Sequence, residues 1–573
     1  MRTGAQCVID GLKDAGVTTV FGLPGGAVLD LFDTLSRAPF EFVLVRHEQG
    51  AAHMADGYAR ATGRTGVCMV TSGPGATNTV TGLATAHMDG VPIVCVTGQV
   101  PSHMIGNDAF QEADTVGITR AVTKHNYLVR NVDDLPRIMA EAFKIARTGR
   151  PGPVLIDIPK DVQRAKTAAV FTGDPDIRSY KPMERGHPKQ ITRLAQAINK
   201  ARKPLFLVGG GVIAGEASAE LTELARKAGV PVATTLLGLG AFPETDPLAL
   251  RMVGMHGFVA ANRAISACDL LVSVGARFDD RVTGKISEFA PHATIAHIDI
   301  DPSAISKSVE THIPVVGHVK QVLQALLLEV QSVDRSGWLT QLDEWKKQSP
   351  AAYDVHSKVL LPQFVIEKIY EVSKGNAIVV TDVGQHQMWS AHFYKYTQPR
   401  TFLSSGGLGT MGFGLPAAIG AQLGRPDKRV VTICGDGGIQ MNFQELVVAV
   451  EHKLPVAVVI LNNGRLGMVR QWQEMFYAKQ YSASILTPDG RPANERMADA
   501  KPGKYLPDFV MMAEAHGALG LRVTRQEEVV KALEKAFTAT GPVVVECIVA
   551  PEENVYPMVP PGASLTEMIQ SMA

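Results

Sequence analysis

Short apolar runs alternate with amphipathic segments along most of this chain. In the first part, residues 1 to about 165, the apolar runs are Thr18–Phe21, Phe42–Val45, Val67–Val70, Ile93–Val96 and Val154–Ile158. The segments between these runs have the apolar spacing of helices. Such alternation predicts a doubly wound parallel sheet, whose functional groups collect at the carboxyl ends of the strands.

The same alternation returns twice further along the chain. Between residues 190 and 330 the strand-like runs are Pro204–Val208, Val230–Thr235, Leu270–Val274 and Thr294–Ile300. From residue 363 to residue 552 they are Ala377–Val380, Val430–Cys434 and Val456–Leu461. Polar stretches near residues 163–190 and 334–362 indicate linkers. We therefore predict an α/β protein of three domains, 1–165, 190–330 and 363–552, with a C-terminal tail at 553–573.

Two apolar runs of the third domain frame a strand–helix–strand unit with polar residues at both strand ends. Gly435-Asp436-Gly437-Gly438 follows the first run, and Asn462-Asn463 follows the second. Because parallel strands end at the same edge of a sheet, Asp436 and Asn463 should lie side by side. A carboxylate and an amide oxygen suit Mg²⁺, which takes its other ligands from phosphate and water. The glycines allow backbone N–H groups to approach a diphosphate closely.

This order of residues resembles the GDG…NN signature of thiamine diphosphate enzymes. Taken alone, the stretch also fits an ordinary Rossmann-type turn followed by a strand that ends in asparagine. The resemblance implies that Asp436 and Asn463 bind Mg²⁺, with the backbone carbonyl of Arg465 as a third protein ligand. It also implies that the coenzyme diphosphate lies against Gly435, Asp436, Gly437, Gly438 and Asn463.

Charge balance and hydropathy narrow the class of protein. Lys+Arg and Asp+Glu each number 56 among 573 residues, so the formal net charge is zero. No large basic field is available to attract nucleic acid or an anionic membrane. No apolar run is long enough to span a bilayer, and the first residues enter an amphipathic helix without a signal-peptide core. The six cysteines have no CxxC spacing and mostly lie in apolar runs, which predicts reduced thiols in a cytoplasmic protein.

In the first domain, motifs at the strand ends narrow the resemblance. GLPGG, RHEQGA and TSGPGATN follow the first three runs, and together they closely resemble the acetohydroxyacid (acetolactate) synthases. An acid such as Glu48 at a strand end is usually a solvated charge or a neighbour of a helix N-cap. The resemblance instead implies that Glu48 hydrogen-bonds the aminopyrimidine ring of the coenzyme and drives its amine to the imino form. It also places Phe110, Gln111 and Lys160 near the substrate, whereas packing for Phe110 and a surface position for Lys160 are the alternatives.

The middle domain combines a glycine triplet with a motif that contains two arginines. Gly209–Gly211 follows a strand, which by itself is a weak nucleotide-binding signal. The motif GARFDDR, with Arg277 and Arg281, ends another strand and suits a diphosphate and a carboxylate, although an ion-pair cluster is the alternative. The resemblance implies the FAD-binding type of the family, with a largely structural flavin, and a second-substrate carboxylate held by Arg281. The FAD site that it implies comprises Arg150, Gly209, Gly210, Gly211, Met255, His256, Arg277, Asp299, Gly406 and Gly407.

The resemblance assigns further residues in the third domain. Met411 corresponds to the residue that wedges the coenzyme into a bent shape, although gap-filling is the usual role of a methionine. Gly409 corresponds to the carbonyl that faces the coenzyme amine. The bent shape is a geometric requirement, because without it the imino nitrogen could not reach the reacting carbon. Trp472 would line the acceptor pocket and favour 2-ketobutyrate over pyruvate, with a buried core indole as the alternative. The remaining coenzyme contacts that it implies are Gln385, His386 and Met468.

The resemblance covers roughly residues 3 to 570 and implies a reaction. Pyruvate is decarboxylated on thiamine diphosphate, and the two-carbon unit condenses with a second pyruvate or with 2-ketobutyrate, as in valine, leucine and isoleucine biosynthesis. In this family Glu48 of one subunit meets Asp436 and Asn463 of another, so a homodimer or homotetramer is expected. Whether a small regulatory subunit and valine feedback also operate stays open.

Two other functions share some of these residues. A pyruvate oxidase or 2-ketoacid decarboxylase would also have Glu48, Asp436 and Asn463, but RFDDR together with GMVRQWQ is not expected there. A degenerate paralogue that serves as a scaffold would have lost a coenzyme-activating or metal-binding residue, and none is missing. One stretch departs from the family pattern: residues 487–504 are polar, and we predict an exposed insertion.

Overall fold

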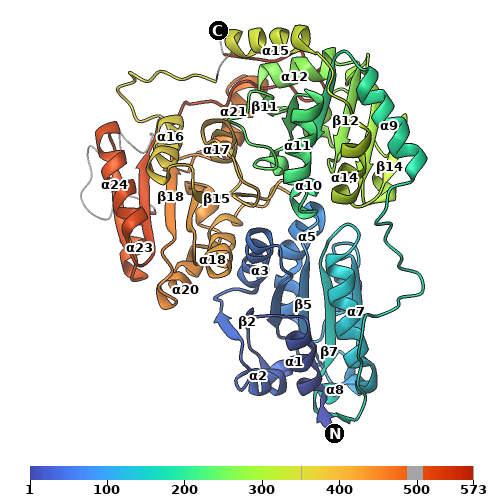
Figure 1. Cartoon of the computed structure of the whole chain (residues 1–573). Coiled ribbons are helices and arrows are strands. Elements are labelled where there is room, and N and C mark those ends of the chain that lie inside the picture. The colour runs from blue at the N-terminus through green and yellow to red at the C-terminus, as the bar shows by residue number, and fades with distance from the viewer. Residues whose placement is uncertain (350, 487–506, 572–573) are drawn as a thin grey trace.

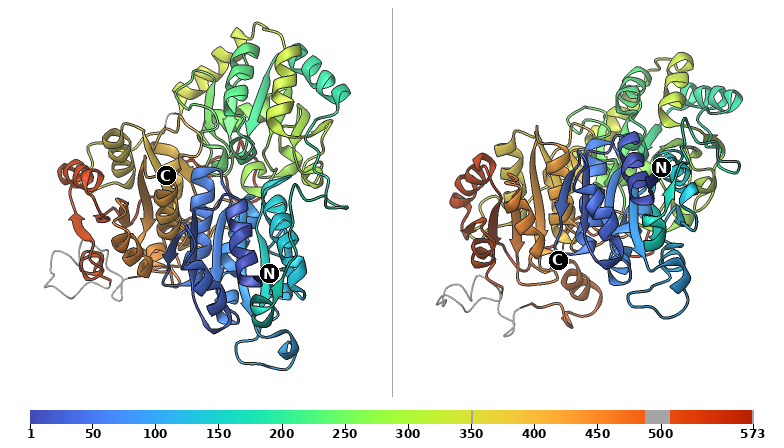
Figure 2. Two further views of the ribbon diagram at one scale, coloured as in Figure 1. Left: turned by 60° about the horizontal axis from the view of Figure 1, so that its bottom comes forward. Right: turned by 90° about the horizontal axis from the view of Figure 1, so that it is seen from below.

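The computed structural model describes residues 1–349, 351–486 and 507–571, and these form three α/β units (Figure 1). Each unit is built on a six-stranded sheet in which every strand pair is parallel. The N-terminal unit lies beside the C-terminal unit, and the middle unit lies across both (Figures 1 and 2). The predicted fold class of three doubly wound parallel sheets is therefore confirmed.

The first sheet has the strand order β3-β2-β4-β5-β7-β6, and β1 pairs with β8 in a separate antiparallel ribbon. The strands are β1 (Arg2–Thr3), β2 (Thr19–Leu23), β3 (Glu41–Leu44), β4 (Gly66–Val70), β5 (Ile93–Gln99), β6 (His125–Leu128), β7 (Val154–Pro159) and β8 (Lys166–Thr167). The helices are α1 (Gly4–Asp14), α2 (Leu29–Leu35), α3 (Glu48–Thr62), α4 (Pro74–Asn78), α5 (Val80–Asp89), α6 (Thr115–Thr119), α7 (Leu135–Arg147) and α8 (Lys160–Arg164).

The middle sheet has the order β11-β10-β9-β12-β13-β14. Its strands are β9 (Pro204–Val208), β10 (Val232–Thr234), β11 (Ala249–Met252), β12 (Leu270–Val274), β13 (Thr294–Asp299) and β14 (Ile313–Val316). Its helices are α9 (Pro188–Lys200), α10 (Gly210–Ala214), α11 (Ser218–Ala228), α12 (Val259–Ala267), α13 (Asp280–Thr283), α14 (Val319–Glu329) and α15 (Ser336–Gln348). Helix α15 occupies the charged stretch predicted to be a linker, and it packs on this sheet because Trp338 is buried and donates to Pro204 O.

The third sheet has the order β16-β15-β17-β18-β20-β19. Its strands are β15 (Ala377–Thr381), β16 (Phe402–Leu403), β17 (Arg429–Gly435), β18 (Ala457–Asn462), β19 (Leu519–Val523) and β20 (Val543–Ile548). Its helices are α16 (Pro362–Ser373), α17 (Gln385–Phe393), α18 (Gly414–Gly424), α19 (Asp436–Ile439), α20 (Leu446–Glu451), α21 (Gly467–Phe476), α23 (Phe509–Ala515) and α24 (Gln526–Thr538). The predicted insertion at 487–504 lies outside the described residues.

The two apolar runs that frame the GDG…NN motif become β17 and β18, which are neighbours in the sheet and parallel. Both strands are buried almost throughout, as expected for continuous apolar runs covered on two faces. Several short edge strands, among them β6, β14 and β16, were not predicted. Each of these three strands has four residues or fewer, and a run this short does not distinguish a strand from a helix, so its sequence signal is weak.

Helices α3 and α18 join the first and third units at very close range. A Cβ atom on Gly57 would lie 2.0 Å from Ala417 O, and one on Gly420 would lie 1.9 Å from Met54 O. Residues of both units share one apolar core around this contact. The two helix backbones therefore pack directly on each other, which sets the position of the first unit on the third.

All six cysteines lie within the described part of the chain, and each is a buried free thiol. No helix among the described residues combines the length and the apolar character needed to cross a membrane.

A buried carboxyl group in the first unit leads to a prediction about pH. Asp157 on β7 is 1% exposed and accepts hydrogen bonds from Thr97 Oγ1 (2.7 Å) and Gln99 Nε2 (2.9 Å). Burial raises the pKa of Asp157 to about 7, although both hydrogen bonds favour the charged form. An unfolded aspartate has a pKa of about 3.9, so the unfolded chain loses this proton first as the pH rises. Folding should therefore become less favourable between about pH 4 and pH 7.

We expect the thermal midpoint of Asp157→Asn protein, measured relative to that of wild type, to rise as the pH goes from about 4 to about 7. Above pH 7 the difference between the two midpoints should stay constant. Differential scanning calorimetry across this range measures the difference. Asp161→Asn, which removes an exposed carboxylate of the same unit, is the control and should show a smaller trend with pH. A midpoint difference between Asp157→Asn and wild type that does not change with pH would contradict the raised pKa of Asp157.

Candidate active site

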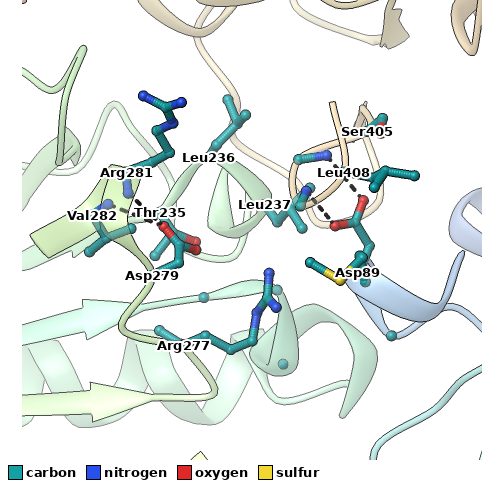
Figure 3. Close-up of a pocket in the computed structure, with 18 of the residues that line it drawn as sticks. Asp89, Thr235, Leu236, Leu237, Arg277, Asp279, Arg281, Val282, Ser405 and Leu408 are labelled. Atoms are coloured by element: carbon teal, nitrogen blue, oxygen red, sulfur yellow. Dashed lines mark hydrogen bonds between the residues drawn. The ribbon is translucent and has the colours of Figure 1, made fainter. Parts of the chain in front are cut away.

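A large pocket lies where the three units meet, with a cavity volume of approximately 1700 Å³ (Figure 3). The first unit lines it with the end of α5 and the segment after α7, and the middle unit with the turns that follow β9, β12 and β13. The third unit contributes the glycine-rich turn near Gly409 and the start of α21. The carboxyl ends of parallel strands therefore converge on this space, as expected for α/β sheets.

One part of the pocket has the features of a dinucleotide site. All ten residues predicted to bind FAD line this pocket. Gly209 and Gly211 allow the turn after β9 to pack on the end of β12, because a Cβ atom on Gly209 would lie 2.3 Å from Gly275 O. The helix that follows, α10, begins at this turn.

Two arginines face this part of the pocket. Arg150 donates to His87 O (3.2 Å) and Met88 O (2.8 Å), and its pKa is lowered by burial and by the neighbouring charge of Arg277. Neither arginine forms an ion pair with a carboxylate among the described residues. An anionic group such as a diphosphate would neutralise both charges, so these residues fit a dinucleotide.

Arg281 and Trp472 face each other across the pocket although they come from different units. Arg281 lies on α13 and Trp472 on α21, and the guanidinium carbon is 5.7 Å from the centroid of the indole ring. Arg281 Nη1 also lies 3.1 Å from Met255 Sδ. The Arg281 side chain is 58% exposed, so its charge remains available to a carboxylate in the pocket. Trp472 is therefore a pocket residue and not a core indole.

Three residues predicted to contact thiamine diphosphate line the same pocket from the third unit: Gly409, Met411 and Met468. Gly409 has a φ of +73°, a conformation that glycine adopts without strain. Met411 lies beside the GDG turn, because a Cβ atom on Gly437 would be 3.6 Å from Met411 Cε. The pocket thus leads from the arginines to the turn that carries Asp436.

Asp436 and Asn463 come together at the ends of β17 and β18, as predicted from the strand order. Asp436 is 4% exposed, and burial raises the pKa of its carboxyl group to about 7, against the backbone amides of Gly464 and Gly437 that favour the charged form. Asn463 donates to Gln385 Oε1 (3.4 Å) and accepts from the backbone N–H of Arg465 (3.0 Å). A buried carboxylate beside an amide oxygen fits a hard cation, which would favour the ionised form of Asp436.

Gln385 and His386 begin helix α17 directly above this turn. Gln385 Nε2 donates to Gln471 Oε1 (2.9 Å) and to Glu553 O (2.9 Å). His386 Nε2 is buried and has no hydrogen-bond partner among the described residues, and burial lowers the pKa of the ring to about 3. A Cβ atom on Gly435 would lie 3.0 Å from His386 Nδ1, so the ring stands against the GDG turn. The unpaired nitrogen suits a phosphate oxygen at this place.

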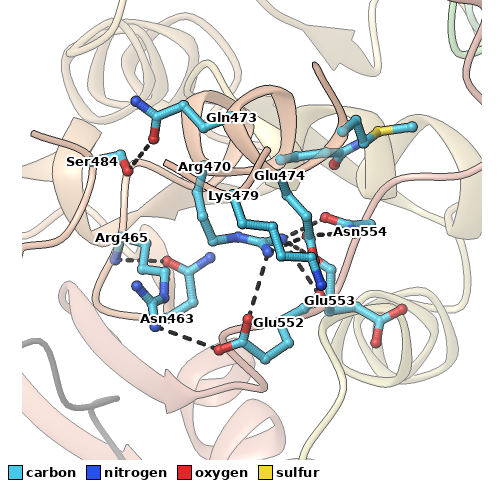
Figure 4. Close-up of polar contacts among 12 residues, drawn as sticks. Asn463, Arg465, Arg470, Gln473, Glu474, Lys479, Ser484, Glu552, Glu553 and Asn554 are labelled. Carbon is cyan, nitrogen blue, oxygen red and sulfur yellow. Dashed lines mark hydrogen bonds and ion pairs between the residues drawn. The ribbon is translucent and has the colours of Figure 1, made fainter. Parts of the chain in front are cut away.

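A network around Arg470 fixes helix α21 to the C-terminal tail (Figure 4). Arg470 is fully buried, pairs with Glu474 at 2.7 Å and Glu552 at 3.7 Å, and donates to Glu553 O at 3.0 Å. Gln471 exchanges two hydrogen bonds with the backbone of Val555. These contacts set the orientation of the helix that carries Met468 and Trp472.

The four residues of the first unit that were predicted to act on coenzyme or substrate do not line this pocket: Glu48, Phe110, Gln111 and Lys160. Glu48 stands in the first turn of α3, is 8% exposed, and accepts a hydrogen bond from Asn78 Nδ2 at 3.0 Å. Phe110 is 87% exposed, Gln111 has a φ of +59°, and Lys160 donates to Gly26 O at 2.8 Å. Within one chain, these four residues therefore lie outside the pocket.

Comparisons with known proteins agree with this geometry. Residues 2–118, 191–326 and 382–547 match the N-terminal TPP binding domain, the central domain and the C-terminal TPP binding domain of thiamine pyrophosphate enzymes. The acetolactate synthase large subunit of Corynebacterium glutamicum is 48% identical over 574 residues, which cover 99% of this chain and 90% of that protein. The acetolactate synthase isozyme 3 large subunit of Escherichia coli K12 is 46% identical over 581 residues, covering 99% and 98%. The chain belongs to the acetolactate synthase large-subunit family.

Membership of this family makes the chain a thiamine pyrophosphate (thiamine diphosphate) enzyme, and it confirms the resemblance drawn from the motifs. The central-domain match covers residues 191–326, which contain β9 to β14 and hence Arg277 and Arg281. The C-terminal match covers both Asp436 and Asn463.

Within the acetolactate synthase fold, two buried acids near the pocket were not among the predicted site residues. Asp382 follows β15, and its carboxylate accepts the backbone N–H groups of Val383, Gly412 and Gly414 at 2.8 to 3.1 Å. Asp89 ends α5 and accepts two backbone N–H groups from the loop after β16. Asp382 could have been found from the sequence, because it follows a predicted strand. Asp89 stands just before a glycine at a helix end, a position that does not indicate a functional residue.

Proposed function

We propose that this chain catalyses the decarboxylation of pyruvate and the condensation of the two-carbon unit with a second 2-keto acid to form 2-acetolactate. The observation that carries the proposal is the pocket in which Arg281 and Trp472 stand opposite the coenzyme turn of Gly409 and Met411. A cation and an aromatic wall suit a 2-keto acid, whose carboxylate and short alkyl group differ in polarity. Pyruvate and 2-ketobutyrate are the proposed acceptors, in valine, leucine and isoleucine biosynthesis.

The cofactors in this proposal are thiamine diphosphate, Mg²⁺ and FAD. Thiamine diphosphate supplies an electron sink for the carbanion that forms when a 2-keto acid loses CO₂. Asp436, Asn463 and the backbone carbonyl of Arg465 would hold Mg²⁺, and His386 would donate to the diphosphate. Glu48 would hydrogen-bond the ring nitrogen of the aminopyrimidine and hold a proton there. The apolar side chains of Met411 and Met468 would exclude water from the reacting carbon.

FAD would occupy the part of the pocket lined by Arg150, Arg277 and the Gly209–Gly211 turn. The two arginines would neutralise its diphosphate, and Asp299, at the end of β13, would accept a ribose hydroxyl. The reaction requires no redox step, so the flavin would act through its contacts. Its ring system would reach toward the turn of Gly406 and Gly407.

An active site between subunits would explain why Glu48 and the pocket are separate in one chain. We propose that Glu48, Phe110, Gln111 and Lys160 of one subunit complete the pocket of a second copy, in a homodimer or homotetramer. Phe110 is 87% exposed, so its side chain is accessible to a second copy, which supports this arrangement. The relatives are named large subunits, and a small regulatory subunit is a further proposed partner. A cytoplasmic location belongs to the same proposal.

Product analysis tests the proposed function directly. Purified protein is assayed with pyruvate, Mg²⁺ and thiamine diphosphate, with and without FAD, and acetolactate is separated from acetaldehyde and acetyl phosphate. We expect acetolactate as the main product, with a requirement for FAD. Acetolactate formed equally well without FAD would show that the middle unit does not supply a required flavin. Acetaldehyde or acetyl phosphate as the main product would favour a decarboxylase or a pyruvate oxidase instead.

The acceptor role of Trp472 leads to a further prediction. Trp472→Leu should lower the preference for 2-ketobutyrate over pyruvate by about tenfold, the effect of about one methylene-sized contact in an apolar pocket. Competition between the two acceptors measures the product ratio. Trp345→Leu on α15, which removes an indole that packs on Trp338 instead, is the matched control and should leave the ratio unchanged. An unchanged ratio in Trp472→Leu would remove this residue from the acceptor pocket.

A further inference from the structure

The last residue of α5, Asp89, connects the first unit with a loop of the third unit. Its side chain is fully buried, and its two carboxylate oxygens accept the backbone N–H groups of Gly406 (3.0 Å) and Gly407 (2.7 Å). Figure 3 shows both hydrogen bonds at the turn that carries Ser405 and Leu408. This contact spans more than three hundred residues of sequence. It fixes the turn at the wall of the pocket.

Arg60 holds Asp89 in place from helix α3. Its guanidinium pairs with Asp89 at 2.9 Å and with Asp56, and it donates to Ser404 O at 3.0 Å. Burial alone would lower the pKa of Arg60, but the two carboxylates raise it above its ordinary value. A buried charge is costly unless it is paired and hydrogen-bonded, so Arg60, Asp56 and Asp89 are expected to stay together. The result is a rigid support directly behind the loop.

The loop that Asp89 supports, Ser405–Met411, faces both parts of the pocket. Gly406 and Gly407 lie in the part proposed for FAD, and Gly409 and Met411 lie in the part proposed for thiamine diphosphate. A Cβ atom on Gly407 would lie 2.7 Å from Asp89 Oδ1 and 3.1 Å from Arg277 Nη2. The loop backbone therefore runs between the acid that supports it and the arginine proposed to bind the flavin.

Helix α5 touches this loop at a second point. Thr85 Oγ1 and Thr410 Oγ1 form a buried hydrogen bond of 2.7 Å. The same helix end also receives Arg150, which donates to the carbonyls of His87 and Met88. Helix α5 therefore contacts Arg150 and the two glycines of the flavin part, and also Thr410, the residue before Met411.

We propose that Asp89 is a positioning residue that couples the two parts of the pocket. The loop position that presents Gly409 and Met411 to thiamine diphosphate is the position that places Gly406 and Gly407 against FAD. Binding of either cofactor then selects the same loop position, so each increases the affinity for the other. This coupling rests on the proposed function, because it assumes that both cofactors bind where the pocket suggests.

The test measures binding in the full-length protein and does not depend on turnover. The dissociation constant of FAD is measured by flavin fluorescence with and without thiamine diphosphate and Mg²⁺, and that of thiamine diphosphate with and without FAD by calorimetry. In wild type we expect each cofactor to tighten the other by the same factor, since coupling is reciprocal, within the usual range of about 5- to 150-fold. We call this ratio of dissociation constants, without and with the other cofactor, the coupling factor. In Asp89→Asn the coupling factor should fall close to one.

The Asp89→Asn variant keeps the shape of the side chain but removes its charge, and it turns one acceptor into a donor that faces another N–H group. Glu244→Gln is the matched control, because Glu244 is a buried acid that pairs with Arg251 and accepts the N–H of Tyr396 away from the pocket. It should lower stability while the coupling factor stays at the wild-type value. Thr85→Val removes the bond to Thr410 together with the bond that Thr85 Oγ1 donates to Thr81 O within α5, and it should lower the coupling factor partway, even where Asp89→Asn does not fold.

The outcomes separate this inference from the proposed function. Protein that binds neither FAD nor thiamine diphosphate would overturn both. Wild-type protein that binds both cofactors with a factor of one would overturn the coupling alone. A wild-type factor in folded Asp89→Asn would do the same, and so would a wild-type factor in Thr85→Val when Asp89→Asn does not fold. A factor that falls in Asp89→Asn and not in Glu244→Gln would support the assignment.

Discussion

Replacing Glu48 by glutamine is expected to lower kcat for acetolactate formation by about 10²–10⁴-fold, the usual contribution of a positioned acid–base group. Glutamine has nearly the same shape, and its amide oxygen can still accept the hydrogen bond from Asn78 Nδ2. It cannot share a proton with a ring nitrogen, which is the role proposed for this carboxyl group. The flavin part of the pocket contains no contact with Glu48, so FAD should stay bound.

Steady-state assays of acetolactate give kcat, and flavin absorbance of the purified variant gives the FAD content. The control is Glu41→Gln on β3, an acid of the same unit that lies near His452 on the surface. It should leave both quantities at their wild-type values. Loss of FAD together with activity would indicate a folding defect in place of a chemical one. Full activity in Glu48→Gln would remove this residue from the mechanism.

The strand ends show how far sequence reasoning reaches in this protein. Asp436 and Asn463 could be paired in advance because a parallel sheet brings consecutive strand ends together, and β17 and β18 are indeed neighbours. Arg277 could be placed at a strand end for the same reason, since it follows β12, but only the family resemblance favoured a site over an ion-pair cluster there. In each case local patterns and one rule of sheet geometry were enough to place the residue at a strand end.

Asp89 shows where that reasoning stops. Its partners Gly406 and Gly407 belong to another unit, which is held against the first unit where α3 packs on α18 at backbone distance. Small residues permit that contact, but a sequence pattern does not say which helix of another unit will fill the space. Side-chain networks between units are therefore accessible only from the structure. Arg470 is a similar case within one unit, because it also pairs with Glu552 and donates to Glu553 O in the segment after β20.

Replacing Asp436 by asparagine is expected to abolish the Mg²⁺-dependent binding of thiamine diphosphate. Removing a group that merely orients a metal ligand typically costs about 10- to 100-fold in metal affinity, so losing the charge of a direct ligand should cost more. Calorimetric titration with thiamine diphosphate and Mg²⁺ measures the loss, and chelation of Mg²⁺ from wild type should reproduce it. Asp427→Asn, an exposed acid paired with Arg425, is the control and should bind normally. Normal affinity in Asp436→Asn would place the metal elsewhere.

Mixing the two inactive variants then tests whether the active site lies between subunits. In a dimer of one Glu48→Gln chain and one Asp436→Asn chain, one site would receive both intact residues and the other site would receive both replacements. Random mixing makes half of the dimers mixed, so about a quarter of wild-type activity should return. Each variant alone should stay inactive after the same dissociation and reassociation. If Glu48 and Asp436 of the same chain formed one active site, every site in the mixture would carry one replacement and no activity would return.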